Sequence, residues 1–524
     1  MSPAVSIVVA GGTPAELGRF AHALEGQTLP PSEIEVLTSA PGLSPAQGWN
    51  EAARRAGAPL LIFTRADFGP APDFARSLLA IGRRSGDAVG IGRVARNAGR
   101  SALTRYAAEL WEVDRLAPFA AERVPPLAAA DSPLLVGRER FLGLSGFAPE
   151  LEWGQEVDLA LRLLAAGARL ERTETAIGTR PAFHGNAELL ARAESDGRGS
   201  ALLYRHQSSS LPHLELGSYT AAGRRAVLLR NRLLALGVHP PLLASLTPLL
   251  PTATGDRWAR FVVSYAFWRG VWRELTDRDA RQRLQEPPVI LMYHAIGDRS
   301  ERPGRYVVPE ERFAAQLRWL RRRGYRPVRL EEIFEHRRQF RLPPSRSVAI
   351  TFDDGYEDNH RLALPHLRRA GMPATFFLVS ARLGVANGWD QDGELAGRRL
   401  IEVEQAHELQ AAGMELGGHT RHHPPLSEID PGELDGEIAG CRADLTQALG
   451  GPVSSFAYPY GKTSPAARDA VERAGFLGAV CSRSGFNDPA VPEYALRRIE
   501  IRGTDSLADF AGAVRRGHRH RRGR

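Results

Sequence analysis

The chain has 524 residues, of which 43% are hydrophobic and 24% charged, a composition typical of a globular protein of about two to four domains. The formal net charge is +8, but six arginines lie in the last ten residues, so the remainder is nearly neutral. A nearly neutral body argues against a nucleic-acid-binding protein, and we expect no nucleic-acid partner. We expect residues 511–524 to be a basic disordered tail, with contact to nucleic acid, anionic lipid or an acidic polymer as the alternative.

Signals for secretion and membrane insertion are not evident in the sequence. The opening MSPAVSIVVA lacks a charged region and leads directly into a strand-like pattern. No apolar run is long enough to span a bilayer without charges. The most apolar segment, residues 226–250, contains Arg230, Arg232 and Pro240, which favours packed helices over a helix pair lying on a membrane. We therefore predict a cytoplasmic protein, with peripheral membrane contact as the alternative.

The first part of the chain alternates strand-like and helix-like patterns. Strand-like runs at 5–10, 34–40 and 59–68 are separated by helical patterns at 14–27 and 44–57. This order predicts an α/β domain over residues 1–210 with a mostly parallel sheet. Helical patterns with arginine-rich faces and proline breaks follow, and we expect residues 211–286 to be a helical linker.

From residue 287 the alternation of strands and helices starts again. Strand-like runs begin with PVILMYHAI and SVAITF and end with ALRRIEIR, with helical patterns between most of them. Seven or eight such strands over about 220 residues predict a closed parallel barrel over residues 287–510 rather than an open sheet. Cys441 and Cys481 are expected to be buried free thiols, although a single disulfide stays open.

Two adjacent carboxylates provide the first chemical signal. Asp353 and Asp354 follow the strand-like Ser347–Phe352, and Gly355 makes the turn. The carboxyl ends of barrel strands are where active sites are built, and two adjacent carboxylates point in different directions and can take different roles. Taken alone, the Asp-Asp-Gly sequence is more often a simple turn than a site.

The second signal is GGHTRHHPP at residues 417–425. On one helical turn, His419 and His423 would place both rings on one face, with His422 off that face. Two imidazoles and one carboxylate would leave an open fourth position, which is the pattern of a catalytic zinc site. The alternative is a polar loop that happens to be rich in histidine.

The third signal is SSFAYPYGK at residues 454–462. Pro459 and Gly461 restrict the backbone, so a main-chain amide near Tyr460 could point into a site. A fixed amide is what a tetrahedral oxyanion needs. In isolation, this segment would be only an aromatic turn.

In this order along one predicted barrel, the three signals resemble the polysaccharide deacetylases, the NodB-homology group of carbohydrate esterase family 4. The resemblance covers about residues 288–510 and includes LMYHAI, TFDDGYEDN, GMPATFFLV, GGHTRHHPPL, FAYPYG and LRRIEIRG. It implies a distorted (β/α) barrel. It also implies metal-dependent hydrolysis of N-acetyl groups on N-acetylglucosamine-type sugars, as in a chitooligosaccharide deacetylase. The implied partner is an acetylated amino-sugar glycan, and the implied cofactor is Zn²⁺, or Co²⁺ or Ni²⁺ in its place.

The resemblance also assigns roles to residues. It implies that Asp354, His419 and His423 hold the metal and that Asp353 is the general base. The Tyr460 amide would stabilise the oxyanion. Thr420 would then support the histidine loop.

Two departures from the family pattern affect the predicted site. Many members have an arginine that orients the base where this chain has Ala457, and the usual late histidine that acts as general acid is missing. His294, at the end of the first barrel strand, is our candidate acid, and local packing is its alternative role. The candidate substrate contacts are Tyr458, Pro459 and Arg498.

The first domain resembles the GT-A fold of glycosyltransferase family 2 over about residues 4–205. Its chemical residues depart from that family: Thr38-Ser39 replaces an acidic pair, and only Asp67 of the metal-binding Asp-x-Asp remains, after Arg65 and Ala66. The transferase-like site that remains consists of Asp67, Glu156 and Asp158.

We expect a degenerate transferase domain that binds a glycan or a partner. The alternative is a metal-independent transferase in which Arg65 meets the diphosphate of a nucleotide-sugar or lipid-linked sugar and Glu156 is the base. For the whole chain we predict a deacetylase of glycan biosynthesis. A bifunctional glycosyltransferase–deacetylase and a non-catalytic glycan-binding protein are the alternatives.

Overall fold

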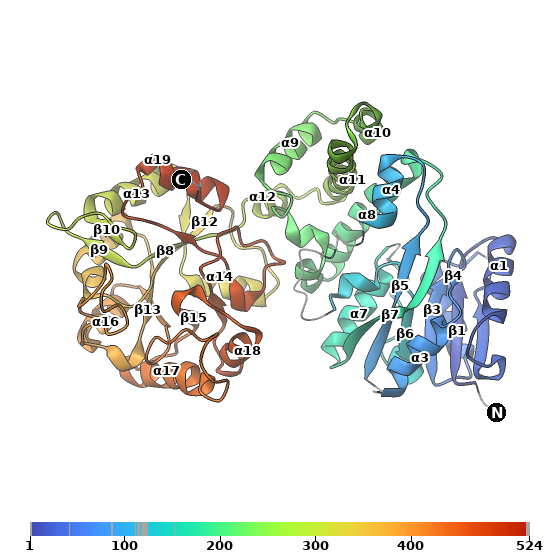
Figure 1. Ribbon diagram of the computed structural model, residues 1–524, viewed down its shortest axis with the longest axis horizontal. Helices are drawn as coiled ribbons and strands as arrows, with labels where there is room; N and C mark the ends of the chain where they lie inside the picture. Colours follow the sequence, from blue (N-terminus) through green and yellow to red (C-terminus); the bar gives the residue numbers. More distant parts are fainter. Residues whose placement is uncertain are drawn as a thin grey trace. The chain divides into compact units, whose positions relative to one another are not determined.

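The computed structural model describes residues 3–519 apart from residues 41, 85, 86, 111, 113–115, 117–123 and 152. The chain divides into two compact units, Met1–Thr276 and Asp277–Arg524 (Figure 1). Of the predicted basic tail, residues 511–516 belong to helix α19 (Leu507–Arg516), and residues 520–524 lie outside the described residues. Among the described residues, no helix is long and apolar enough to cross a membrane.

The first unit contains one mixed seven-stranded sheet. Its strands, in spatial order, are β2 (Ile34–Thr38), β1 (Val5–Ala10), β3 (Leu60–Arg65), β6 (Leu134–Gly137), β5 (Ala88–Arg96), β7 (Arg169–Arg180) and β4 (Gly69–Pro70). Five of them run in one direction, whereas β6 and β4 run antiparallel to their neighbours. The carboxyl ends of β3, β5 and β7 therefore lie at the same edge of the sheet, where an α/β sheet binds ligands.

Helices cover this sheet and extend into a helical layer. The helices are α1 (Pro14–Glu25), α2 (Pro45–Arg55), α3 (Phe74–Arg84), α4 (Ala102–Glu109), α6 (Arg138–Gly143), α7 (Gln155–Ala165), α8 (Asn186–His206), α9 (Arg224–Ala235), α10 (Pro240–Ala244) and α11 (Thr252–Glu274). Several of these helices begin at strong N-caps. The side chains of Thr13 and Ser44 accept hydrogen bonds from backbone N–H groups of the first turn, and a proline follows each of them.

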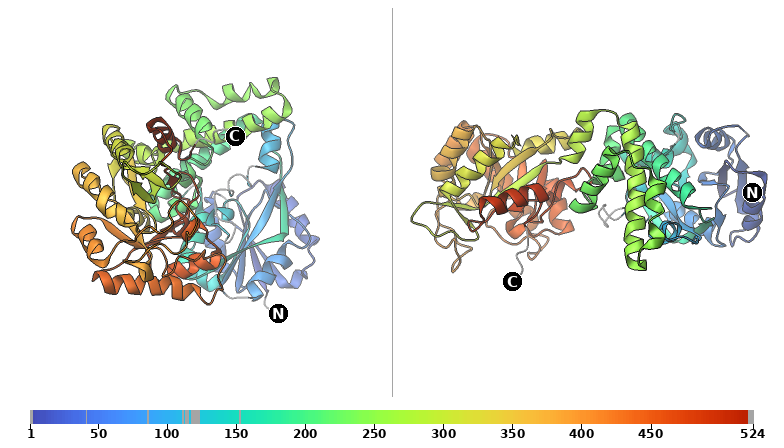
Figure 2. Two further views of the ribbon diagram at one scale, coloured as in Figure 1. Left: turned by 60° about the vertical axis from the view of Figure 1, so that its left-hand side comes forward. Right: turned by 90° about the horizontal axis from the view of Figure 1, so that it is seen from above.

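Of the predicted linker, residues 211–276 belong to the first unit and residues 277–286 to the second. Leucines and aromatic residues of α4, α8, α10 and α11 share one hydrophobic core, and the green helices α9–α11 lie together in both views of Figure 2. At the crossing of α8 and α11, a Cβ on Gly197 would lie 1.9 Å from the Phe267 carbonyl oxygen, and one on Gly270 would lie 1.9 Å from that of Glu194. Only glycine permits this approach of the two backbones.

The second unit contains a curled parallel sheet surrounded by helices (Figure 1). Its strands, in order, are β16 (Gly478–Val480), β15 (Ser455–Ala457), β14 (Glu415–Gly418), β13 (Thr375–Leu378), β12 (Ser347–Phe352), β8 (Val289–Tyr293) and β17 (Ile499–Glu500), with β11 (Arg326–Pro327) paired to β12. A bridge between Val480 and Leu496 joins the two edges. The sheet agrees with the predicted distorted barrel.

The remaining elements close the barrel on its outside and at one end. They are β9 (Ala295–Gly297), β10 (Val307–Pro309), α12 (Arg278–Gln285), α13 (Glu310–Arg322), α14 (Leu330–Arg338), α15 (Leu364–Ala370), α16 (Val403–Ala411), α17 (Leu434–Leu449), α18 (Pro465–Arg473) and α19. Leu330, Ile333 and Phe334 of α14 pack against a cluster that includes Ile290 and Phe377 of the strands. Because the end of the barrel next to α14 is filled with apolar side chains, we expect the polar residues of an active site at the carboxyl ends of the strands.

Candidate active site

The predicted site residues of the second unit lie where its parallel strands end. Asp353 and Asp354 follow β12, and His419 and His423 follow β14. His294 follows β8, and Tyr460 belongs to a short turn after β15. Neighbouring parallel strands therefore bring these residues together at one edge.

Asp354 and the two histidines converge on a single point. Asp354 Oδ1 lies 3.2 Å from the Nε2 atom of each histidine, and one ligand atom from each residue lies within 4.8 Å of the others. All three side chains are buried. His419 Nδ1 lies 2.8 Å from the Ala457 carbonyl oxygen and donates its proton there, so the neutral ring would present its Nε2 lone pair to a metal. This donor set fits a divalent metal ion with an open position.

The histidine loop is not the helical turn that the spacing predicted. Thr420 and His423 have φ angles of 66° and 68°, in the left-handed region, and no helix covers residues 419–425. The Thr420 hydroxyl accepts a hydrogen bond of 2.9 Å from the His423 N–H, which supports its predicted role in the loop. His422 is exposed and its Nδ1 lies 2.6 Å from Glu437, away from the other two histidines.

Backbone strain concentrates in this region. Of the eight described non-glycine residues with positive φ, four are Asp354, Thr420, His423 and Tyr460. Such conformations cost about 1–3 kcal/mol each and persist where surrounding structure imposes them. The strain indicates that the arrangement of these groups is maintained at the expense of stability.

Arg498 has a role that the sequence did not reveal. Its Nη1 and Nη2 donate to the two carboxylate oxygens of Asp353 at 2.6 and 2.7 Å, and its Nε donates to the Cys481 carbonyl. The side chain has no exposed surface. The buried guanidinium holds Asp353 in place, which is a different role from the predicted substrate contact. It supplies the charge expected at Ala457 from the segment just before β17, which is distant in the sequence.

The two carboxylates are ionised despite their burial. Burial raises the pKa of Asp353, but the charge of Arg498, followed by that of His419, lowers it below its usual value. For Asp354, hydrogen bonds from His419 and His423 outweigh burial and hold the pKa well below its usual value. Burial lowers the pKa of His423, which favours the neutral imidazole that a metal ligand needs.

The aromatic turn divides into buried and exposed residues. Tyr458 is fully buried and its hydroxyl donates to the Tyr494 carbonyl at 2.9 Å, and Pro459 is also buried. Neither side chain is accessible, and the substrate contacts of these two residues stay predictions. Tyr460 is 53% exposed, and its ring lies 4.8 Å from that of His423.

His294 lies beside the carboxylates. Its charge affects the pKa values of both Asp353 and Asp354, and its buried Nδ1 has no hydrogen-bond partner among the described residues. Its ring packs edge-on against Tyr306 at 4.8 Å. This position is compatible with the predicted acid and does not exclude the packing alternative.

Two loops that the sequence did not single out complete the wall of the site. Trp389 stacks on the His423 ring at 4.3 Å, on a loop that also contains Glu394 and Arg398. Tyr306 and Trp389 pack against the same small cluster of buried apolar residues. The metal-ligand pattern is thus flanked by three partly exposed aromatic rings, those of Trp389, Tyr460 and Tyr306.

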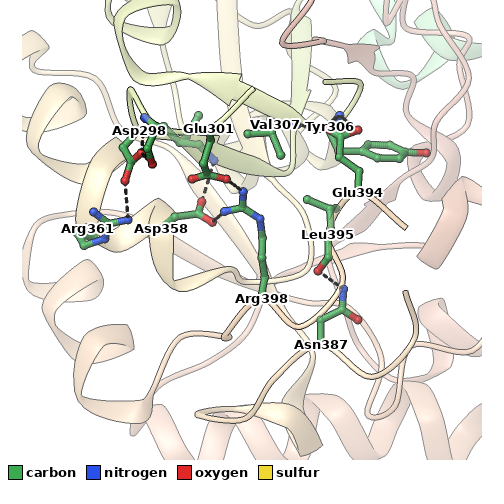
Figure 3. Close-up of polar contacts among 12 residues, drawn as sticks. Asp298, Glu301, Tyr306, Val307, Asp358, Arg361, Asn387, Glu394, Leu395 and Arg398 are labelled. Carbon is green, nitrogen blue, oxygen red and sulfur yellow. Dashed lines mark hydrogen bonds and ion pairs between the residues drawn. The ribbon is translucent and has the colours of Figure 1, made fainter. Parts of the chain in front are cut away.

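Carboxylates fix these loops to each other (Figure 3). Glu394 accepts hydrogen bonds from the successive amides of residues 305–307, at 2.8 to 3.2 Å. Arg398 is paired with Asp358 at 2.6 Å and with Glu301, and Asp358 also accepts from the Ile296 amide at 2.7 Å. The loops that carry Tyr306 and Trp389 are therefore held by charged hydrogen bonds rather than by a large hydrophobic core. We call the rings of Trp389, Tyr460 and Tyr306 the aromatic wall.

In the first unit, the predicted transferase-like residues have different surroundings. Glu156 is buried, and burial followed by the nearby Asp131 raises its pKa to about 7. Asp67 is half-buried beside Arg180 at 3.4 Å. Asp158 is buried and paired with Arg162 of its own helix at 2.6 Å, and its place in a site stays a prediction. In the second unit, Cys441 and Cys481 are buried free thiols.

Comparisons with known proteins concern the deacetylase-like part of the chain. Residues 341–479 match the family model for polysaccharide deacetylase. The putative polysaccharide deacetylase YxkH of Bacillus subtilis (strain 168) is 28% identical over 233 residues, which is 44% of this chain and 78% of that protein. The poly-beta-1,6-N-acetyl-D-glucosamine N-deacetylase of Staphylococcus aureus (strain MRSA252) is 24% identical over 205 residues, 37% of this chain and 68% of that protein.

Among solved structures, IcaB from Ammonifex degensii is 25% identical, with a TM-score of 0.38, covering 44% of this chain and 97% of that one. The family match and the two relatives support a polysaccharide deacetylase domain in the second unit. Members of this family are hydrolases that act on amide bonds, and carbohydrate esterase family 4 deacetylases in general depend on a metal.

Proposed function

We propose that the second unit is a metal-dependent deacetylase that removes N-acetyl groups from an N-acetylglucosamine-type glycan. The observation that carries this proposal is the convergence of Asp354, His419 and His423 next to Asp353. The Staphylococcus aureus relative, whose name gives poly-beta-1,6-N-acetyl-D-glucosamine as its substrate, favours a β-linked amino-sugar polymer.

The chain's own groups divide the reaction between them. A bound Zn²⁺, or Co²⁺ or Ni²⁺, would supply a Lewis acid for the amide carbonyl and lower the pKa of a water molecule. Asp353, oriented by Arg498, accepts the proton of the attacking water as general base. The main-chain N–H of Tyr460 donates to the oxyanion, a contribution whose loss typically costs about 3 kcal/mol of barrier.

The remaining steps use His294 and the aromatic wall. His294 gives a proton to the leaving amine, so that the carbon–nitrogen bond breaks to release acetate and a free amino sugar. The rings of Trp389, Tyr460 and Tyr306 offer apolar faces to the sugar rings on either side of the acetyl group.

Metal content and acetate release from N-acetylated chito-oligosaccharides, with and without chelator, test the proposal. We expect chelator-sensitive release, Asp353→Asn to keep the metal and lose turnover, and Asp354→Asn to lose both. Glu428→Gln, in an exposed residue paired with Lys462, is the control and should keep both. A protein that binds metal but releases no acetate from any acetylated glycan would be a binding protein instead.

A second candidate function concerns the first unit, where Arg180 stands out. This side chain is 5% exposed, yet among the described residues it makes only ion pairs of 3.4 Å with Asp67 and 3.8 Å with Asp131, and its Nε finds no hydrogen-bond partner there. Buried donors are nearly always hydrogen-bonded. We propose that the phosphate of a nucleotide-linked or lipid-linked sugar completes this arrangement, with Arg65 and Arg96 at the same sheet edge.

Calorimetric titration of the full chain with pyrophosphate tests this second candidate. We expect Arg65→Gln and Arg180→Gln to weaken binding by tenfold or more and the exposed control Arg19→Gln to leave it unchanged. Sugar transfer that is abolished by Glu156→Gln would establish the bifunctional enzyme. Absence of pyrophosphate binding would leave the first unit as a scaffold.

A further inference from the structure

Leucines are unusually exposed on α9, α10 and the short helix η5 (Thr247–Leu249). Six of the thirteen large apolar side chains exposed in the described chain lie between residues 228 and 249: Leu228, Leu229, Leu236, Leu242, Leu246 and Leu249. Leu236 and Leu249 are each 77% exposed and Leu242 is 64% exposed. Single exposed leucines need no explanation, but such a concentration marks an interaction surface.

These helices have two apolar faces. Leu233, Leu234 and Leu243 point to the core shared with α8 and α11, so the inner face is already covered. Leu242 of α10, Leu246 of the turn after it and Leu249 of η5 are 64%, 44% and 77% exposed in the described chain. The exposed surface of these leucines is thus left over after the first unit has packed.

The charged residues of the segment that contains the leucines have one sign. Residues 221–255 contain no aspartate or glutamate. Arg224, Arg225 and Arg232 are exposed and form no ion pair within the described residues, whereas Arg230 is buried over Tyr219. A protein interface usually has a rim of both signs, whereas leucines bordered by arginines alone match an anionic bilayer surface.

We propose that α9, α10 and η5 bind the chain to the surface of an anionic lipid bilayer. The leucines enter the boundary between headgroups and acyl chains, and Arg224, Arg225 and Arg232 contact lipid phosphates. Burial of the leucine side chains and the attraction of the arginines to anionic headgroups both favour reversible binding. The chain lies on the membrane and does not span it.

Sedimentation of the full chain with vesicles tests this proposal. We expect binding to vesicles of equal parts phosphatidylglycerol and phosphatidylcholine, and at least fivefold less binding to phosphatidylcholine alone. Leu236→Gln and Leu249→Gln should each lower the bound fraction at least fivefold, because these exposed side chains support no core. Leu507→Gln, in an exposed leucine of the second unit, is the matched control and should bind like the unmodified chain.

Three results would overturn the proposal. Absence of sedimentation with anionic vesicles would do so directly. Binding that survives both leucine substitutions would come from the arginine-rich end of the chain. A dimer in light scattering that Leu236→Gln dissociates would mean that a second copy covers the leucines. Acetate release, measured in detergent-free solution, is independent of all these outcomes and distinguishes this proposal from the proposed deacetylase.

Discussion

The two hydrogen bonds from Arg498 to Asp353 lead to a prediction about catalysis at the scale of one residue. Arg498→Met should lower kcat by about 100-fold, the range for a displaced general base, while metal content and KM change little. Arg498→Lys should recover only part of the rate, because an ammonium group cannot hold both carboxylate oxygens. Steady-state kinetics and metal analysis provide the measurements. Loss of metal together with rate would show that Arg498 supports the whole site instead.

Glu415 gives a prediction about pH. Its carboxylate lies among the strands, accepts from Thr375 at 2.7 Å and from the Glu331 amide at 3.1 Å, and burial raises its pKa from 4.5 to about 7. Between these values the folded state holds a proton that the unfolded state has released, so stability falls as the pH rises from about 4.5 to about 7. This loss amounts to about 3 kcal/mol for Glu415.

Urea denaturation at several pH values measures this effect. The substitution Glu415→Gln removes the titrating group, so the stability of the variant relative to the unmodified protein should increase between pH 5 and pH 7 and then level off. Glu331→Gln, in a less buried residue of α14, serves as a comparison. A stability difference that stays constant with pH would show that Glu415 ionises normally.

At the scale of elements, strand ends were predictable and loops were not. The pattern of buried strands located Asp353, Asp354, His419 and Tyr460, because each follows a strand whose composition is unmistakable. The conformation of the histidine loop was mispredicted. Two histidines four residues apart can be brought together by a helical turn, but also by a strained turn in which Thr420 has a left-handed backbone conformation. The contacts of Arg498 and Trp389 were not predicted because long-range folding, not local pattern, brings these residues to the site.

The loop with Trp389 leads to a prediction about substrate length. Trp389→Ala should raise KM for chito-oligosaccharides by about tenfold, with little change for N-acetylglucosamine itself, because stacking on neighbouring sugars is lost. Glu394→Gln should raise KM in the same direction by a smaller factor, since one amide oxygen replaces the carboxylate that three backbone amides share. Asp392→Asn in the same loop is the control. Equal effects on both substrates would exclude neighbouring-sugar contacts.

At the scale of the whole molecule, the two α/β units were predictable, but the place of residues 211–274 was not. The sequence marked these residues as helices of mixed polarity, and such helices fit a linker or a packed layer equally well. Their membership of the first unit depends on the crossing at Gly197 and Gly270, where two backbones meet. A glycine in a helix does not indicate from the sequence alone which other helix will pack against it.

Because each unit has its own core, ligands should stabilise the units separately. Calorimetry should show two unfolding transitions, and zinc should raise only the transition of the second unit. At a ligand concentration of about 100 times Kd the stabilisation is about 2.7 kcal/mol, which shifts a unit of this size by about 5–10 °C. Pyrophosphate should raise only the other transition. The substitution Asp354→Asn should abolish the zinc shift and leave the pyrophosphate shift intact, whereas Arg180→Gln should do the opposite. If either ligand moved both transitions together, the two units would unfold as one and their sites would be coupled.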